Sequence, residues 1–348
     1  MDVTINADQQ LLTDTAASVA DALATTSTAA LPPDQSSSTG AWETLCETGF
    51  VAMRLTEALG GGGATSFDTA LVIEQLARRL SIAPMIGQGV LAPELLASAG
   101  ADRDRLHRIV DGTHRVTVAV DPTMCGLARA GCAAFVWDAL GAHEALALDD
   151  ADRVVSIDLS TTRFADHAPT SADLTRLVHV VPSGSPAQPV GAALDAAALA
   201  RFEALALAML AADLVGVMQG AVDAAAGYVR ERVQFGVPVG SFQAVQHLAA
   251  DAKVMLEGAR SSMWHAAWAV DALDPSDALL AARQAKSYCS RAGRNVVEIH
   301  VQLYGGIAIT WEELAHVRVR RALFDRASFG DENYQDDAIA LARVGAAR

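Results

Sequence analysis

The feature that most constrains the fold is a hydrophobic pattern that changes its period twice along the 348 residues. Residues 1–111 place apolar side chains at helical spacing, whereas residues 112–190 contain short β-branched runs such as HRVTVAVD and RVVSIDL. From residue 191 the helical spacing returns. This order predicts an α+β fold with an N-terminal helical domain (1–111), a reduced middle β domain (112–190) and a C-terminal four-helix domain (191–348).

The C-terminal domain gives the clearest helical pattern. Its alanine-rich stretches place small residues on several helix faces, which allows close packing on more than one side. We therefore expect an obligate oligomer with a large apolar interface. Four helices are predicted. The first spans about 195–231, the second runs from the turn at Pro238–Gly240 to about 271, and the third spans about 276–303. The last begins near Glu312 and has a break at Gly330.

Composition narrows the class of protein. Hydrophobic residues make up 51% of the chain, and the formal net charge of −15 argues against nucleic acid or an anionic membrane as partner. The four cysteines form no C-x-x-C pair, and the N-terminal residues do not resemble a signal peptide. No window reads as apolar and long enough to cross a bilayer. We expect a soluble, cytoplasmic protein without a metal site.

The stretch RERVQFGVPVGSFQAVQH (230–247) separates two long helical patterns with polar, turn-forming residues. Arg232 supplies a planar cation suited to phosphate oxygens, and Pro238 with Gly240 favours a turn. Gln243 opens the next helix, whose N-terminal amides favour an anion. Taken alone, the stretch fits either a grip on a dinucleotide or an ordinary helix–turn–helix with a solvated arginine.

A second stretch, VQLYGGIAITWEELAHVRVRRA (301–322), ends a helix in two adjacent glycines. Together the stretches resemble the acyl-CoA dehydrogenase family, whose members carry R-x-x-F-G-x-P-I-x-x-F-Q followed by Q-x-x-G-G-x-G. Here the motifs read RVQFGVPVGSFQ from Arg232 and QLYGGIA from Gln302. The block from Trp42 to Leu80 also looks like the family's opening helices, so the resemblance covers nearly the whole chain.

The resemblance implies FAD as cofactor and an acyl-CoA thioester as substrate. In such enzymes a carboxylate removes the α proton while the flavin accepts a hydride from the β carbon. An electron-transfer flavoprotein or a similar acceptor then takes the electrons. The resemblance assigns six residues to nucleotide binding, on the FAD of a neighbouring subunit: Arg232, Phe235, Gln243, Gln302, Gly305 and Gly306.

The chain departs from the family where the catalytic base should be. Counting from the motifs, the two positions used by family members are Phe329 and Ala206, and neither side chain can take a proton. Many family members have an arginine directly after the second position, and this chain has Leu207 there. The Gly-Ser-Asp stretch that contacts flavin and substrate is also absent, with Asp121-Pro122 as a possible remnant.

Other titratable residues could take the place of the catalytic base. Glu203, about one turn before Ala206, is the candidate relocated base, although a surface or structural role fits it better. The same structural role is expected of Asp213, Asp325 and Asp331, and ordinary helix histidines are expected at His247, His265 and His300. The cluster of Arg318, Arg320 and Arg321 is expected on a solvated or interface helix face.

These departures resemble the shorter subunit of bacterial α2β2 acyl-CoA dehydrogenases, which has lost its base and completes the FAD site of a longer partner. We interpret the chain as such a non-catalytic partner in lipid or steroid degradation. Two alternatives stay open: a complete homo-oligomeric dehydrogenase with its base at Glu203, and a flavin-free scaffold. The sequence does not name the acyl group.

Overall fold

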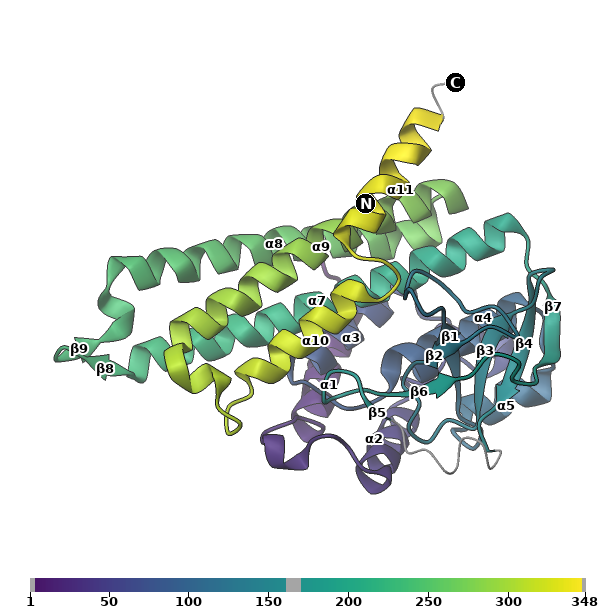
Figure 1. Ribbon diagram of the computed structural model, residues 1–348, viewed down its shortest axis with the longest axis horizontal. Helices are drawn as coiled ribbons and strands as arrows, with labels where there is room; N and C mark the ends of the chain where they lie inside the picture. Colours follow the sequence, from purple (N-terminus) through teal and green to yellow (C-terminus); the bar gives the residue numbers. More distant parts are fainter. Residues whose placement is uncertain (1–3, 161–169, 346–348) are drawn as a thin grey trace.

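The computed structural model describes residues 4–160 and 170–345. A long bundle of C-terminal helices carries the β-sheet near one end and a small hairpin at the other, and the first N-terminal helices lie along its middle (Figure 1). The predicted α+β class with its three successive textures is confirmed. Residues 161–169, within the predicted β domain, lie outside the described part of the chain.

The N-terminal helices pack around one apolar core that continues into the C-terminal bundle. Each of the first three begins with a side-chain cap: Asn6, Asp34 and Thr65 accept a backbone N–H in the first turn. The helices are α1 (Ala7–Ala22), α2 (Gln35–Glu47), α3 (Ser66–Arg78), α4 (Ala92–Ser98) and α5 (Arg103–Val110), with short turns η1 (Thr28–Ala30), η2 (Glu57–Leu59) and a π-helical η3 (Met85–Leu91).

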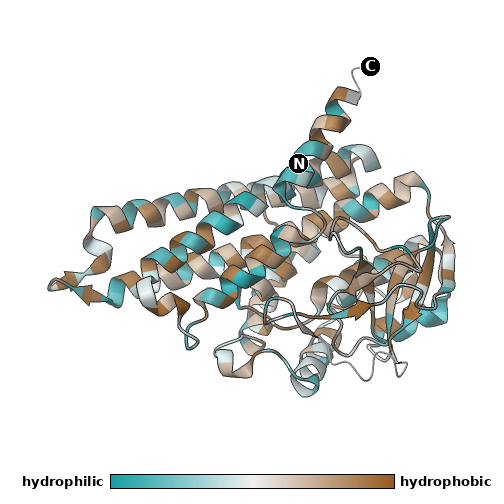
Figure 2. Ribbon diagram, in the orientation of Figure 1, coloured by the Kyte–Doolittle hydropathy of each residue, from teal (hydrophilic) through white to brown (hydrophobic). Residues whose placement is uncertain are grey.

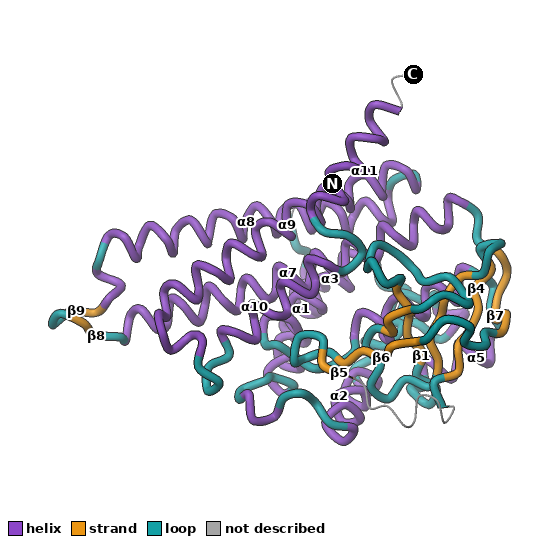
Figure 3. Tube along the Cα trace, viewed as in Figure 1, coloured by secondary structure: helices purple, strands orange, loops and turns teal. Residues whose placement is uncertain are grey.

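The middle of the chain forms one seven-stranded sheet in the order β5-β6-β2-β1-β3-β4-β7. Only the β1–β3 pair is parallel among the described pairings. Figure 3 shows these strands gathered away from the hairpin, and Figure 2 shows them mainly hydrophobic. The strands are β1 (Val116–Val120), β2 (Ala134–Val136), β3 (Glu144–Leu148), β4 (Arg153–Asp158), β5 (Thr170–Ser171), β6 (Leu177–Val181) and β7 (Gln188–Ala193).

The C-terminal bundle follows the predicted helices closely. The predicted break at Gly330 separates the last two helices, and the last packs on α9. The helices are α7 (Ala196–Glu231), α8 (Gln243–Ala272), α9 (Pro275–Tyr304), α10 (Ala315–Ala327) and α11 (Glu332–Gly345), joined by the hairpin β8 (Val233–Gln234)–β9 (Val237–Pro238), η4 (Val239–Ser241) and η5 (Gly305–Ile309).

Helix α7 is the central helix of the molecule. Gly216 and Gly220 let it cross α3 closely, because a Cβ at either position would collide with backbone carbonyls of Glu74 or Arg78. Its length and mean hydropathy would suffice to cross a membrane, so the expectation that no window would do so is wrong. Of that apolar window, 89% is buried inside the protein, as in a core helix.

Candidate functional site

The two family-like motifs lie at the same end of the bundle. Helices α7 and α9 both end there, and their last turns are joined by Tyr228 and Tyr304, whose rings stack at 4.3 Å. The hydroxyl of Tyr304 also donates to the carbonyl of Ala224 at 3.3 Å. We call this end, made of the β8–β9 hairpin and the η5 loop, the bundle tip (Figure 1).

The hairpin turns at Phe235 and Gly236. Both have positive φ, 55° and 81°, as in the tight two-residue turns that suit the twist of a hairpin. The turn expected at Pro238 and Gly240 is a separate one: Val239–Ser241 form the 3₁₀ turn η4 that leads into α8. Gly240 also permits close approach to α7, because a Cβ there would lie 2.9 Å from the carbonyl oxygen of Val229.

The hairpin side chains predicted to bind a nucleotide face solvent. Phe235 is 93% exposed, and its ring meets Phe242 edge-on at 6.2 Å. Arg232 and Gln243 are exposed as well, and the Arg232 guanidinium has no hydrogen-bond partner among residues 4–160 and 170–345. No side chain caps the first turn of α8, and the Val245 amide donates to the Phe242 carbonyl at 3.0 Å, which leaves the amides of Gln243 and Ala244 for an anion.

The diglycine loop lies at the same tip. Gly305 has a φ of 68°, a conformation that favours glycine, and both glycines and Gln302 are exposed. Beyond them Ile309 and Trp311 present large apolar surface, 76% and 52% exposed. The tip therefore exposes apolar groups after the diglycine loop and a cation, Arg232, at the end of α7, a combination that suits an interface and a phosphate-bearing ligand.

The first base position of the family is closed. Phe329 is 2% exposed, and its loop is bound on both sides: the Gly330 amide donates to the Met124 carbonyl at 2.9 Å, and Lys286 Nζ donates to the carbonyls of Arg326 and Gly330, each at 2.9 Å. Burial lowers the pKa of this lysine to about 8. Lys286 therefore acts as an internal clamp on the loop.

The second base position is equally inaccessible. Ala206 is fully buried in α7 and belongs to the same apolar cluster as Phe329 and Trp137. The Trp137 ring, at the end of β2, lies edge-on to Phe329 at 6.3 Å and beside Phe324 at 5.7 Å. The space between the sheet, α7 and the Phe329 loop is thus filled by aromatic side chains.

A buried ionic network completes this junction. Arg176, in the turn before β6, binds Asp213 of α7 at 2.9 Å and Asp325 of α10 at 3.0 Å. Arg321 binds Asp213 at 2.7 Å and donates to the carbonyl of Ser81 at 2.7 Å. The Arg176 guanidinium also lies 5.1 Å over the Trp137 ring. We call Arg176, Asp213, Arg321 and Asp325 the junction network.

The pKa values of the two carboxyls in the junction network are shifted in opposite directions. Burial would raise the pKa of Asp213, but Arg176 and Arg321 outweigh it and leave that pKa below its usual range. Burial raises the pKa of Asp325 well above its usual value, and its Oδ2 has no hydrogen-bond partner within the described residues. Asp325 therefore favours its protonated form beside ionised Asp213.

The tip has groups that suit the phosphates of a nucleotide such as FAD. Arg232 is an exposed cation there, and the first turn of α8 has no side-chain cap. Beside the junction network, a cavity lined by Asp138, Thr175 and Arg176 measures about 10 Å³, roughly one water molecule. This cavity is separate from the base positions, because neither Phe329 nor Ala206 lines it.

The candidate substitute bases have structural partners. Glu203 pairs with Arg283 at 2.9 Å and lies outside the junction network. Asp331 accepts backbone N–H groups of Asn333 and Tyr334, both at 3.1 Å, and so begins α11. The structural role expected of these carboxylates fits their contacts.

Two expectations about basic residues are wrong. Arg321, expected on a solvated or interface face, is 3% exposed and ion-paired, while Arg318 is half-buried and Arg320 alone is exposed. His300, expected to be satisfied, has no partner for either ring nitrogen among the described residues. His247 and His265 are exposed helix histidines, as expected.

Sequence reasoning missed Trp137, Arg176 and Lys286. Their contacts join segments far apart in the chain, and neither motif contains them. A tryptophan directly after a short strand was visible in the sequence, but nothing local distinguishes Arg176 or Lys286 from solvated side chains.

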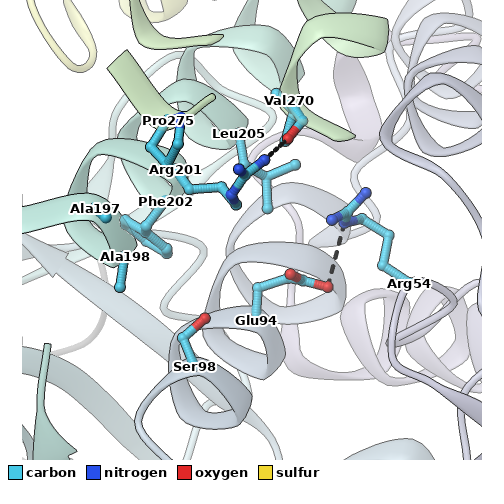
Figure 4. A pocket seen from close by; sticks show the side chains of 10 residues that line it. All are labelled: Arg54, Glu94, Ser98, Ala197, Ala198, Arg201, Phe202, Leu205, Val270 and Pro275. Atoms are coloured by element: carbon cyan, nitrogen blue, oxygen red, sulfur yellow. Dashed lines mark hydrogen bonds and ion pairs between the residues drawn. The ribbon is translucent and has the colours of Figure 1, made fainter. Parts of the chain in front are cut away.

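A separate pocket of about 320 Å³ lies between α4, the start of α7 and the end of α8 (Figure 4). Its two arginines are already engaged. Arg54 pairs with Glu94 at 3.2 Å, and Arg201 donates to backbone carbonyls of Val270 and, at 3.2 Å, Leu273. Arg201 thereby satisfies the carbonyls that end α8, which is a structural role.

Comparison with known proteins agrees with the motifs. Residues 6–108 match the model for the acyl-CoA dehydrogenase N-terminal domain, and residues 198–343 match that for the C-terminal domain. The acyl-CoA dehydrogenase IpdE2 of Mycobacterium tuberculosis is 31% identical over 301 residues, covering 84% of this chain and 83% of IpdE2.

Solved structures show the same fold. A steroid acyl-CoA dehydrogenase, Tcur3481–Tcur3483, superposes with a TM-score of 0.82 at 24% identity, over 99% of this chain and all of the other. A chain of the ChsE4–ChsE5 complex from Mycobacterium tuberculosis gives 0.79 at 22% identity, over 99% of each chain. Motifs, domain models and a relative matched along most of its length agree: the chain belongs to the acyl-CoA dehydrogenase family.

Proposed function

We propose that this chain is the non-catalytic partner subunit of an FAD-dependent acyl-CoA dehydrogenase. The observation that carries the proposal is the contrast between the two ends of the molecule. At the junction both base positions, Phe329 and Ala206, are buried apolar residues behind a closed ionic network. At the tip the family's nucleotide-binding residues are present and exposed.

Each tip residue then has a role toward the FAD of the neighbouring subunit. Arg232 supplies positive charge to the pyrophosphate, with the Gln243 end of α8 beside it. Phe235 covers an apolar part of the nucleotide, and Gln302 with Gly305 and Gly306 lets the backbone approach it. When bound, FAD supplies the hydride acceptor; the base belongs to the partner.

The proposed partner is a longer chain of the same family that retains its glutamate. Two structural neighbours, one titled a steroid acyl-CoA dehydrogenase and one a two-chain complex, support this choice. We propose an acyl-CoA thioester as substrate, an electron-transfer flavoprotein or similar acceptor, and a cytoplasmic location. We also propose that the chain divides into three domains, residues 1–111, 112–190 and 191–348.

Flavin content tests the proposal. The chain is purified alone and after co-expression with a longer family member from the same source, and FAD is quantified by absorbance per mole of each chain. We expect little or no FAD in the isolated chain and one FAD per pair of unlike chains in the complex. A yellow isolated chain that oxidises acyl-CoA would contradict the proposal.

The two alternatives give different outcomes in the same experiment. A homo-oligomeric dehydrogenase with its base at Glu203 would be yellow and active alone. The pairing of Glu203 with Arg283 argues against this role. A flavin-free scaffold would leave even the complex colourless; the retained tip residues argue against it.

A further inference from the structure

A further cavity, partly open to solvent, lies between α7, α8 and α9, about one to three helical turns from the tip. Its volume is about 110 Å³. Apart from one histidine, its walls are aliphatic, and small alanines of α7 and α8 leave the space open. Representative wall residues are Val222, Ala225, Ala252, Ile299 and Leu303, with His300 as the polar member.

His300 is the unusual feature of this cavity. It is 2% exposed, and neither Nδ1 nor Nε2 has a hydrogen-bond partner within the described residues. Its ring meets Tyr304 edge-on at 4.6 Å, a contact that uses no ring nitrogen as a hydrogen-bond partner. Burial, with a smaller effect of nearby Arg318, lowers the pKa of His300 to about 3. The imidazole is therefore neutral and offers one donor and one acceptor.

An unpartnered polar group this deeply buried calls for an occupant. Buried donors and acceptors are nearly always hydrogen-bonded, because leaving one unpaired forfeits its hydration. Water suits the site poorly, since a buried water needs two to four polar partners and the walls here supply one imidazole. An occupant with an apolar body and a single polar atom satisfies both the walls and the histidine.

We propose that this cavity binds a small uncharged molecule, with an aromatic or branched aliphatic body and one hydroxyl or ring N–H, whose polar atom hydrogen-bonds to His300. This site is separate from the FAD-binding tip and does not depend on the proposed function. A charged ligand is excluded because the aliphatic walls hold no counter-ion and would strip its hydration. The cavity is of the size class that admits a single aromatic ring.

Phenol and pyrrole serve as the probes, with benzoate and toluene as comparisons. Calorimetric titration of the full-length chain, in the assembly in which it purifies, should show saturable binding of phenol or pyrrole at one site per chain. Benzoate, which carries a charge, should not bind. Toluene, which lacks the polar atom, should bind more weakly than phenol in the wild-type chain.

Three variants assign the binding to His300. His300→Leu should weaken phenol binding by about tenfold, the worth of one hydrogen bond, while toluene binding persists. Ala252→Leu should abolish both by filling the cavity. His265→Leu removes an exposed histidine of α8 and should change neither. If His300→Leu does not fold, His300→Gln, which keeps a donor and an acceptor, should retain binding.

The ligand-free protein gives an independent readout. Because His300→Leu removes an unsatisfied polar group, the variant should unfold at a higher urea concentration than wild type. The proposal is overturned if folded wild type binds neither phenol nor pyrrole, or if His300→Leu binds phenol as well as wild type. A crystal soaked with phenol that shows only ordered water on both ring nitrogens would also overturn it.

Discussion

Two neighbouring arginines of α10 show how position decides a residue's role. Arg320 faces solvent, whereas Arg321 is 3% exposed and held by Asp213. The sequence places both in one basic cluster, and only the packing of α10 against α7 separates them. By contrast, the apolar residue at the family's first base position could be predicted, because counting from the diglycine motif leads to Phe329 without any tertiary information.

Replacing Arg321 should therefore cost far more than replacing Arg320. Arg321→Met leaves buried Asp213 with one cation fewer, and breaking a buried pair from one side typically costs about 3–5 kcal/mol. Arg320→Met should change the free energy of unfolding by less than about 0.5 kcal/mol. Urea unfolding measures the free energy of unfolding of both variants. Equal losses in the two variants would show that the junction network does not stabilise the fold.

At the scale of elements, the long helices were predictable and the junctions between elements were not. Helices α7, α8 and α9 carry sustained helical periodicity, and their observed limits lie within a few residues of those predicted. The π-helical η3 and the Lys286 clamp depend on contacts across the chain, which no local pattern encodes. The exposed tip motifs were recognisable, but their location at one end of the bundle follows from the parallel course of α7 and α9.

The hairpin gives a prediction at this scale. Gly236→Ala introduces a Cβ at positive φ, which costs about 1–2 kcal/mol, and should loosen the turn that presents Phe235. Gly227→Ala, in α7, is the matched control because neither glycine has an atom within 4 Å of an added Cβ. Hydrogen exchange should quicken in the hairpin of Gly236→Ala alone, and FAD should leave its complex faster. An unchanged rate of FAD release would show that the hairpin takes no part in FAD binding.

The contact between α5 and the sheet gives a pH-dependent prediction. Burial opposes ionisation of Glu144, but contacts with His114, Ser156 and Arg105 outweigh it and lower its pKa from 4.5 to about 2. A carboxyl whose pKa is lowered by folding stabilises above its unfolded pKa and loses that contribution as pH falls. Between about pH 5 and 2, Glu144→Gln should lose less stability than wild type. Parallel urea midpoints across this range would contradict the assignment.

At the scale of the whole molecule, the exposed apolar surface predicts assembly. Val254 of α8 is 71% exposed, Leu341 and Val344 of α11 are 75% and 61% exposed, and Phe235 and Ile309 at the tip are 93% and 76% exposed. Large exposed apolar groups on several faces suit a multi-subunit core better than a monomer. Sedimentation velocity at micromolar concentration should find an oligomer, alone or with the partner. A single monomeric species would contradict this.

The proposed function requires that this chain binds the FAD of a neighbouring subunit and carries no catalytic base. In the complex, Arg232→Ala should weaken FAD retention by about 1.5–3 kcal/mol, the scale of a hydrogen bond to a charged group. Glu203→Ala, at the candidate relocated base, should leave turnover of the FAD-saturated complex nearly unchanged, whereas loss of a true base costs orders of magnitude. Equilibrium FAD binding and acyl-CoA turnover of these two variants decide the matter. Weaker FAD retention in the first with normal turnover in the second supports the account, and lost turnover in Glu203→Ala with FAD still bound contradicts it.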